Sequence, residues 1–270
     1  LAALGAKKLI ENNKLRATVR FYGCPAEETL HGKVMMIKNG AFKKCDVALT
    51  WHPDSLNANY SKGFVALDSL EFEFNGRASH AAVAPQAGRS ALDAVELMNV
   101  GANYLREHIV DRARIHYNVH GDKYPPNIVP PYAGAWYFVR APRREQVTDI
   151  TRRLIKVAQG AALMTETEMQ VKRISGCYEL NLTPELVKLC EKNMELAPLP
   201  QYTADELKFA KQLQNTVEIE RIREDAEIAE SELMAKRVLK ANETINIPSA
   251  GSTDAGDVSM IMPMQFFNAA

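Results

Sequence analysis

The feature of this sequence that most restricts its fold is a change of hydrophobic period that recurs along residues 64–178. Leu70, Phe72 and Phe74 alternate with polar residues, as in a strand with one buried face. Apolar residues then recur at helical spacing over residues 89–109, and both periods return later in the segment. The order strand, helix, strand, strand, helix, strand predicts a ferredoxin-like antiparallel sheet with two helices on one face.

Two short strand candidates near the start of the chain lead into polar side chains. The first, Leu15–Phe21, is followed by Tyr-Gly-Cys-Pro-Ala and then by Glu27 and Glu28, and the second, Asp46–Trp51, ends directly at His52. Ligands bind at the carboxyl ends of the strands in open α/β sheets. We therefore expect both glutamates and His52 to lie at one edge of a sheet.

These residue types suit a metal site with a general base. Carboxylate and imidazole are ligands for zinc or manganese, and a second carboxylate that stays free of the metal can take a proton from water. A Glu-Glu pair in a loop is most often simply solvated, and a histidine after a strand is usually a surface residue. Cys24, beside the glutamates, is either a thiolate ligand or a packed thiol, and we favour the packed thiol.

The composition of the chain argues against nucleic-acid binding and membrane binding as its function. The chain of 270 residues has a formal net charge of zero, which gives no basis for binding nucleic acid or an anionic membrane. Its four cysteines show no Cys-x-x-Cys spacing, which suits a reducing cytoplasm, and the sequence has no signal peptide or apolar run of membrane length.

The change of pattern at either end of the ferredoxin-like segment predicts two domains. Residues 64–178 read as a module inserted into an α/β domain that consists of residues 1–63 and 179–270. Within the α/β domain we predict a helix over Thr29–Phe42 and further helices from residue 184 onward. A loop rich in glycine and aspartate over residues 250–259 precedes a last strand, and its small residues permit close backbone approach to a site.

Six short motifs, in this order, resemble the aminoacylase and glutamate-carboxypeptidase family of metal-dependent amidohydrolases, and within it the p-aminobenzoyl-glutamate hydrolases. The motifs are GCPAEE, TWHP, GRASHAA, PNIVP, YFVRAP and GSTDAGDVS. Each motif is weak alone, but the six in sequence cover nearly the whole chain. The resemblance implies a zinc-peptidase-like catalytic domain and an inserted module that pairs two subunits through a sheet edge or a helix.

The resemblance also implies a role for individual residues. Glu27 is the general base, while Glu28 and His52 are ligands of a zinc or manganese ion. His80 is an oxyanion donor that often reaches the site of a partner subunit. Asn127 and Arg140 hold the carboxylate end of the substrate, which suits arginine because its planar fork matches a carboxylate.

The expected reaction is cleavage of the amide bond of an N-acyl or N-aroyl amino acid of the p-aminobenzoyl-glutamate kind, with two metal ions in the full-length protein. The family pattern places an early metal-binding motif before Leu1 and a final histidine after Ala270, so we expect a segment of a longer protein, incomplete at both ends. The alternative is a catalytically incompetent chain that acts only through its dimerisation module. We expect a homodimer or a heteromer with a related subunit.

Overall fold

The computed structural model describes residues 1–60, 63–216, 233–244 and 251–270. Its helices are α1 (Ala2–Asn12), α2 (Gly32–Lys38), α3 (Ala91–Leu105), α4 (Arg144–Thr165), α5 (Pro184–Leu196), α6 (Ala204–Gln214) and α8 (Ala255–Ser259). Its strands are β1 (Ala48–Pro53), β2 (Asn57–Asn59), β3 (Ala66–Asn75), β4 (Arg114–His120), β5 (Tyr132–Ala141), β6 (Glu168–Cys177), β7 (Val238–Leu239) and β8 (Met264–Ala269). Among the described residues, no helix is both long and apolar enough to cross a membrane.

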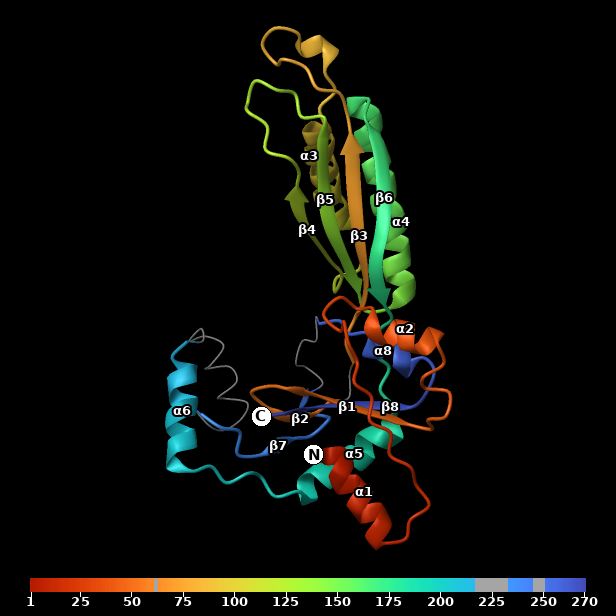
Figure 1. The fold of residues 1–270 in the computed structure, drawn as a ribbon, viewed down its shortest axis with the longest axis vertical. Helices are drawn as coiled ribbons and strands as arrows, with labels where there is room; N and C mark the ends of the chain where they lie inside the picture. The colour runs from red at the N-terminus through yellow and green to blue at the C-terminus, as the bar shows by residue number, and fades with distance from the viewer. Residues whose placement is uncertain (61–62, 217–232, 245–250) are drawn as a thin grey trace.

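Two bodies lie one above the other along the long axis of the molecule (Figure 1). The upper body, which we call the module, consists of β3 to β6 with α3 and α4. The lower body, which we call the base, holds the other helices and strands and both ends of the chain. The chain passes between the two bodies just before β3 and just after β6.

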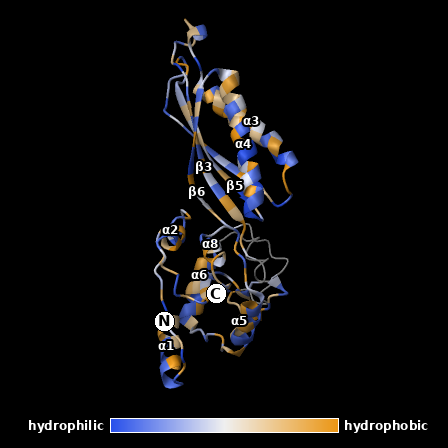
Figure 2. Cartoon of the chain, turned by 90° about the vertical axis from the view of Figure 1, so that its right-hand side faces the viewer, coloured by the Kyte–Doolittle hydropathy of each residue, from blue (hydrophilic) through white to orange (hydrophobic). Residues whose placement is uncertain are grey.

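The module has the predicted element order, β3-α3-β4-β5-α4-β6, and its sheet has the strand order β4-β5-β3-β6 with every neighbouring pair antiparallel. Both helices lie on one side of the strands and leave the other face of the sheet uncovered (Figure 2). The ferredoxin-like arrangement expected from the hydrophobic periods is therefore confirmed.

The core of the module forms where the alternating strand residues meet the helix stripes. Phe72 and Phe74 of β3 are fully buried, as are Met98 of α3 and Leu154 of α4. The rings of Phe72 and Tyr137 meet edge to face, with their centroids 5.5 Å apart. Each large side chain buried in this way stabilises the fold by about 1.5–3 kcal/mol before entropy costs.

The base contains a mixed sheet of strand order β1-β8-β2-β7, in which β1 runs parallel to β8 and β2 antiparallel to it. The predicted strand at Asp46–Trp51 is confirmed as β1, which also includes His52 and Pro53. The core of the base is formed by residues of this sheet and of α8 together with the segment around α2, and includes Phe42 and Phe266.

Two predictions for the base are wrong. Leu15–Phe21 is neither helix nor strand, and Phe21 is 84% exposed, so the segment has no buried face to hold it against a sheet. The helix predicted over Thr29–Phe42 is only seven residues long, because Leu30 has a φ of 59° and Gly40 a φ of 76°. These left-handed conformations end a helix on either side of α2.

Candidate active site at the junction of module and base

The two glutamates lie in a tight turn of residues 26–31 that leads into α2. Ala26 and Leu30, on either side of the pair, have φ angles of 54° and 59°, so the backbone reverses sharply around Glu27 and Glu28. Gly32 packs directly on the chain before the turn, since a Cβ placed there would lie 1.6 Å from the Pro25 carbonyl oxygen. The shape of the turn is thus set by the backbone itself.

A loop that comes more than 200 positions later in the sequence holds this turn from one side. The Thr253 hydroxyl donates to Oε1 of Glu27 at 2.7 Å. Lys33 donates to Asp254 twice, from its backbone nitrogen to Oδ2 at 2.8 Å and from Nζ to Oδ1 at 2.6 Å. Asp254 is fully buried, so this ion pair fixes residues 251–254 on the start of α2.

The module holds the same turn from the other side. His31 Nε2 lies 2.8 Å from the carbonyl oxygen of Ile174 in β6. Leu30 packs in a small apolar cluster with Leu67, Cys177 and Phe138, all from the module strands. The turn that carries the glutamates therefore lies at the junction of module and base, which is a preferred location for ligand sites in proteins of two bodies.

Burial shifts the titration of several side chains at the junction. It raises the pKa of Asp257 to about 6, an effect that the backbone N–H of Tyr178 opposes and the carboxylate of Asp254 reinforces. Burial also raises the pKa of the Cys24 thiol, which the nearby Lys33 ammonium partly offsets. The Cys24 thiol also donates to the carbonyl oxygen of Tyr22, with the sulfur 3.7 Å from that oxygen.

The two predicted metal ligands are not brought together by any contact between described residues. Glu28 is exposed, and so is His52, whose Nδ1 lies 2.6 Å from the carbonyl oxygen of Pro53. No group of three or more His, Cys, Asp or Glu side chains in the described ranges could hold a metal ion. Two donors fall short of the three or four protein ligands of a zinc site, so these residues alone do not fit a metal pair.

His80 and Asn127 lie together at the end of the module that points away from the base. The Ala81 N–H donates to the Asn127 carbonyl oxygen at 2.8 Å, and His80 forms an isolated β-bridge with Ile128. Both side chains are exposed, and His80 Nδ1 accepts a hydrogen bond from the Ala82 N–H at 3.3 Å. The structure brings these two predicted residues together.

Arg140 lies at the opposite end of the module, close to the base. It pairs with Leu67 in the strand register, whereas the distal end of the same two strands is marked by the pair Asn75 and Tyr132. The two pairs are eight residue steps apart along each strand, which corresponds to about 27 Å. Arg140 therefore cannot bind the same small carboxylate as Asn127 of its own chain.

Three residues of the junction were not among the predicted site residues, namely Lys33, Thr253 and Asp254. Residues 250–259 were predicted as a loop that only allows close backbone approach, but residues 255–259 form α8. The expected close approach occurs at Gly256 of this helix, where a Cβ would lie 2.1 Å from the Tyr178 carbonyl oxygen. A short run of Ser, Thr and Asp between glycines is the only sequence signal for these contacts, because their partners are far away in the chain.

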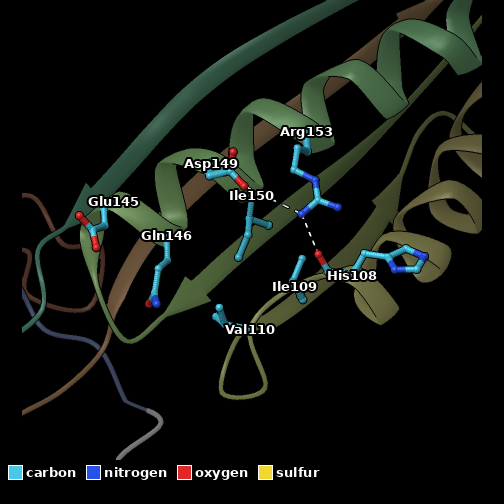
Figure 3. A pocket seen from close by; sticks show the side chains of 8 residues that line it. All are labelled: His108, Ile109, Val110, Glu145, Gln146, Asp149, Ile150 and Arg153. Atoms are coloured by element: carbon cyan, nitrogen blue, oxygen red, sulfur yellow. Dashed lines mark hydrogen bonds and ion pairs between the residues drawn. The ribbon is translucent and has the colours of Figure 1, made fainter.

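A shallow depression of about 450 Å³ lies elsewhere, on the helix side of the module (Figure 3). The segment after α3 and the first turns of α4 line it, and Arg153 Nη1 donates there to the His108 carbonyl oxygen at 2.7 Å. None of the predicted site residues lines this depression. The junction is therefore the better candidate for the active site.

Comparison with known proteins agrees with this organisation. Residues 65–166 match the peptidase dimerisation domain. The chain is 38% identical to a subunit of p-aminobenzoyl-glutamate hydrolase from Escherichia coli K12, over 97% of this chain and 58% of the relative. It is 31% identical to Xaa-Arg dipeptidase of Mus musculus, over 97% of this chain and 52% of that protein. The chain thus spans about half the length of these curated relatives.

Solved structures share the fold. An aminobenzoyl-glutamate utilization protein from Klebsiella pneumoniae superimposes with a TM-score of 0.63 at 18% identity, over 91% of this chain and 56% of that one. A dinuclear metal binding peptidase of the M20 family from Bacillus subtilis superimposes with a TM-score of 0.59 at 15% identity, over 98% of this chain and 60% of that one.

Proposed function

The chain belongs to the M20 peptidase family, and from that premise we propose that it serves the hydrolysis of an N-acyl or N-aroyl amino acid. The substrate class is that of p-aminobenzoyl-glutamate, which the name of the Escherichia coli relative supports. The observation that carries the proposal is the position of the Glu27–Glu28 turn, held between the 251–254 loop and β6 at the junction of module and base. We take residues 1–63 and 179–270 as the catalytic domain, residues 64–178 as the inserted module, and the cytoplasm as the compartment.

In this proposal Glu27 acts as the general base. Its carboxylate takes a proton from the water whose oxygen attacks the amide carbonyl carbon, and it returns that proton to the amine as the carbon–nitrogen bond breaks. Glu27 is half-buried, and within the described part of the chain its side chain is hydrogen-bonded through Oε1 alone, which leaves Oε2 to receive the proton. A general base in such a position contributes about 10²- to 10⁴-fold to the rate.

A divalent metal, zinc or manganese, is the proposed cofactor of the complete active site, where it would polarise the carbonyl group and the water. This chain would contribute Glu28 and His52 to its ligands. Both side chains are exposed in the described structure and available for coordination. The other ligands would come from polypeptide outside the described residues.

In this proposal the substrate is bound by residues from two subunits. His80 and Asn127 lie in the loops beyond the distal strand pair Asn75–Tyr132, which is itself about 27 Å along the strands from the pair that contains Arg140. We therefore propose that they serve the active site of a second subunit, where His80 donates to the oxyanion and Asn127 contacts the substrate. Arg140 binds the substrate carboxylate in the site of its own chain. The second subunit is either another copy or a related subunit, as the dimerisation domain match supports.

A second candidate function is a catalytically incompetent chain that acts only through its module. The observation in its favour is that no group of three potential metal ligands occurs among the described residues. Such a chain would still form dimers, since the module is a complete sheet with both of its helices.

A combined assay separates the two candidates. Purified protein is supplied with zinc or manganese, dialysed, and analysed for bound metal beside hydrolysis of p-aminobenzoyl-glutamate and N-acetylglutamate. Bound metal with release of glutamate supports the hydrolase. A dimer without metal and without glutamate release would overturn it in favour of the incompetent chain.

A further inference from the structure

We infer that Thr253 is the positioning residue for the Glu27 carboxylate, and this inference rests on the proposed role of Glu27 as general base. The hydroxyl of Thr253 lies 2.7 Å from Oε1 of Glu27, from a loop 226 positions later in the sequence. The contact thus joins two segments that the fold alone brings together. Thr253 does not itself touch the substrate in this assignment.

The side chains of the two adjacent glutamates have different environments. Glu27 is half-buried and accepts the Thr253 hydrogen bond, whereas Glu28 is exposed and has no side-chain hydrogen bond within the described part of the chain. This difference matches the difference in their proposed tasks. A metal ion orients the carboxylate that coordinates it, but a general base must be oriented by the protein before the reaction begins.

The direction of the Thr253 hydroxyl is set by a second hydrogen bond. The backbone N–H of Ala255 donates to Thr253 Oγ1 at 3.3 Å, so this interaction uses a lone pair of the oxygen and leaves its proton for Glu27. The same loop cannot slide, because the buried Asp254 binds both the backbone nitrogen and the Nζ of Lys33. Thr253 therefore approaches Glu27 from a fixed point.

The consequence for the reaction is a fixed orientation of the base. With Oε1 engaged by Thr253, Oε2 is the oxygen that receives the proton from water, and the hydrogen bond restrains rotation of the carboxylate about its last bond. Without the hydroxyl, the carboxylate samples several orientations. We expect this loss of a fixed orientation of the Glu27 carboxylate to lower kcat by about 10- to 100-fold. Substrate binding, and with it KM, should change little.

The test uses the full chain with Thr253→Val, which keeps the shape and removes the hydroxyl, and Thr253→Ser, which keeps the hydroxyl. Thr148→Val, at an exposed position of α4, is the matched control. The first measurement is the rate at which a carbodiimide and an amine label Glu27 and Glu28, followed by mass spectrometry. The second is kcat and KM for N-acyl-glutamate hydrolysis.

We expect faster labelling of Glu27 in Thr253→Val, with Glu28 unchanged and with wild-type behaviour in Thr253→Ser and Thr148→Val. An unchanged Glu27 rate in Thr253→Val overturns the inference, and so does an equal rise for both glutamates, which indicates a loosened turn. If the wild type hydrolyses no substrate, the proposed function fails while the labelling still decides the role of Thr253. In an active enzyme, wild-type kcat in Thr253→Val overturns the inference.

Discussion

His31 and Ile174 are joined by a hydrogen bond of 2.8 Å between the imidazole Nε2 and the backbone carbonyl oxygen, although 143 positions separate them in the sequence. Because a carbonyl oxygen only accepts, Nε2 is the protonated ring nitrogen. The bond links the turn that carries Glu27 and Glu28 to a strand of the module. The position of the turn is therefore tied to that of β6.

Removal of this bond should weaken the junction. We expect His31→Leu to lower the free energy of unfolding by about 1 kcal/mol, the usual net value of one hydrogen bond. His31→Gln, whose amide nitrogen can still donate, should lose less. Urea denaturation followed by circular dichroism measures both, and equal stability of the leucine variant and the wild type would contradict the role assigned to His31.

Gly32 should tolerate no side chain. A Cβ there would lie 1.6 Å from the backbone oxygen of Pro25, which cannot move without opening the turn. We expect Gly32→Ala to destabilise the protein by about 3 kcal/mol, as overpacking against backbone does. Gly23→Ala is the control, because nothing lies within 4 Å of a Cβ at Gly23. Thermal unfolding of the two variants should differ clearly, and similar midpoints would refute the close approach.

The proposed role of Glu27 as general base can be tested separately from metal binding. Glu27→Gln keeps the shape of the side chain and its hydrogen-bond acceptor for Thr253 but cannot take a proton at neutral pH. We expect turnover to fall by about 10²- to 10⁴-fold with metal content unchanged. Metal analysis and hydrolysis assays on the same preparation check this, and an active glutamine variant would disprove the assignment.

Arg140 should discriminate between substrates with and without a carboxylate. Its guanidinium lies over the ring of Phe138, 5.8 Å from the centroid, and burial lowers its pKa from the ordinary value of arginine. We expect Arg140→Ala to raise KM for N-acyl-glutamate substrates by about 10- to 100-fold, and to raise it far less for neutral amides. Arg140→Lys should recover part of the loss, and equal effects on both substrate types would count against the assignment.

Asp257 should make stability depend on pH. Its carboxyl accepts a hydrogen bond from the Tyr178 N–H at 3.3 Å, and Asp254 and Arg144 are the charged groups that act on it. The pKa is raised to about 6 from 3.8 because the site is buried, so the folded protein keeps a proton that the unfolded chain loses. Its contribution to stability is complete below pH 3.8 and is lost as the pH rises through about 6.

Asp257→Asn removes this dependence while it keeps an oxygen for Tyr178. At pH 8 we expect the asparagine variant to be more stable than the wild type by about 1 kcal/mol, a value reduced for the partial exposure of the group. The difference should vanish toward pH 4. Denaturant melts across this range measure it, and a constant difference would show that Asp257 does not titrate as described.

Much of the module could be predicted from the sequence because local hydrophobic patterns specify its strands and helices. Alternation over Leu70–Phe74 and helical spacing over residues 89–109 each identify an element without knowledge of its neighbours. The same holds for α5 and α6, the second of which begins at a capping box formed by Thr203 and Glu206.

The base and its site could not be predicted as fully, because they depend on contacts between distant segments. Leu15–Phe21 has the composition of a strand, but composition does not supply a partner, and none lies beside it among the described residues. The hydrogen bond between Thr253 and Glu27 is of the same kind. Residue types identified the glutamates, and only the fold reveals which other side chains hold them.

Module and base have separate hydrophobic cores. One surrounds Phe72 and Tyr137 and the other surrounds Phe42 and Phe266, with no residue in common. We therefore expect calorimetry to show two thermal unfolding transitions rather than one. The apolar contacts of Leu30 at the junction would determine how closely the second step follows the first.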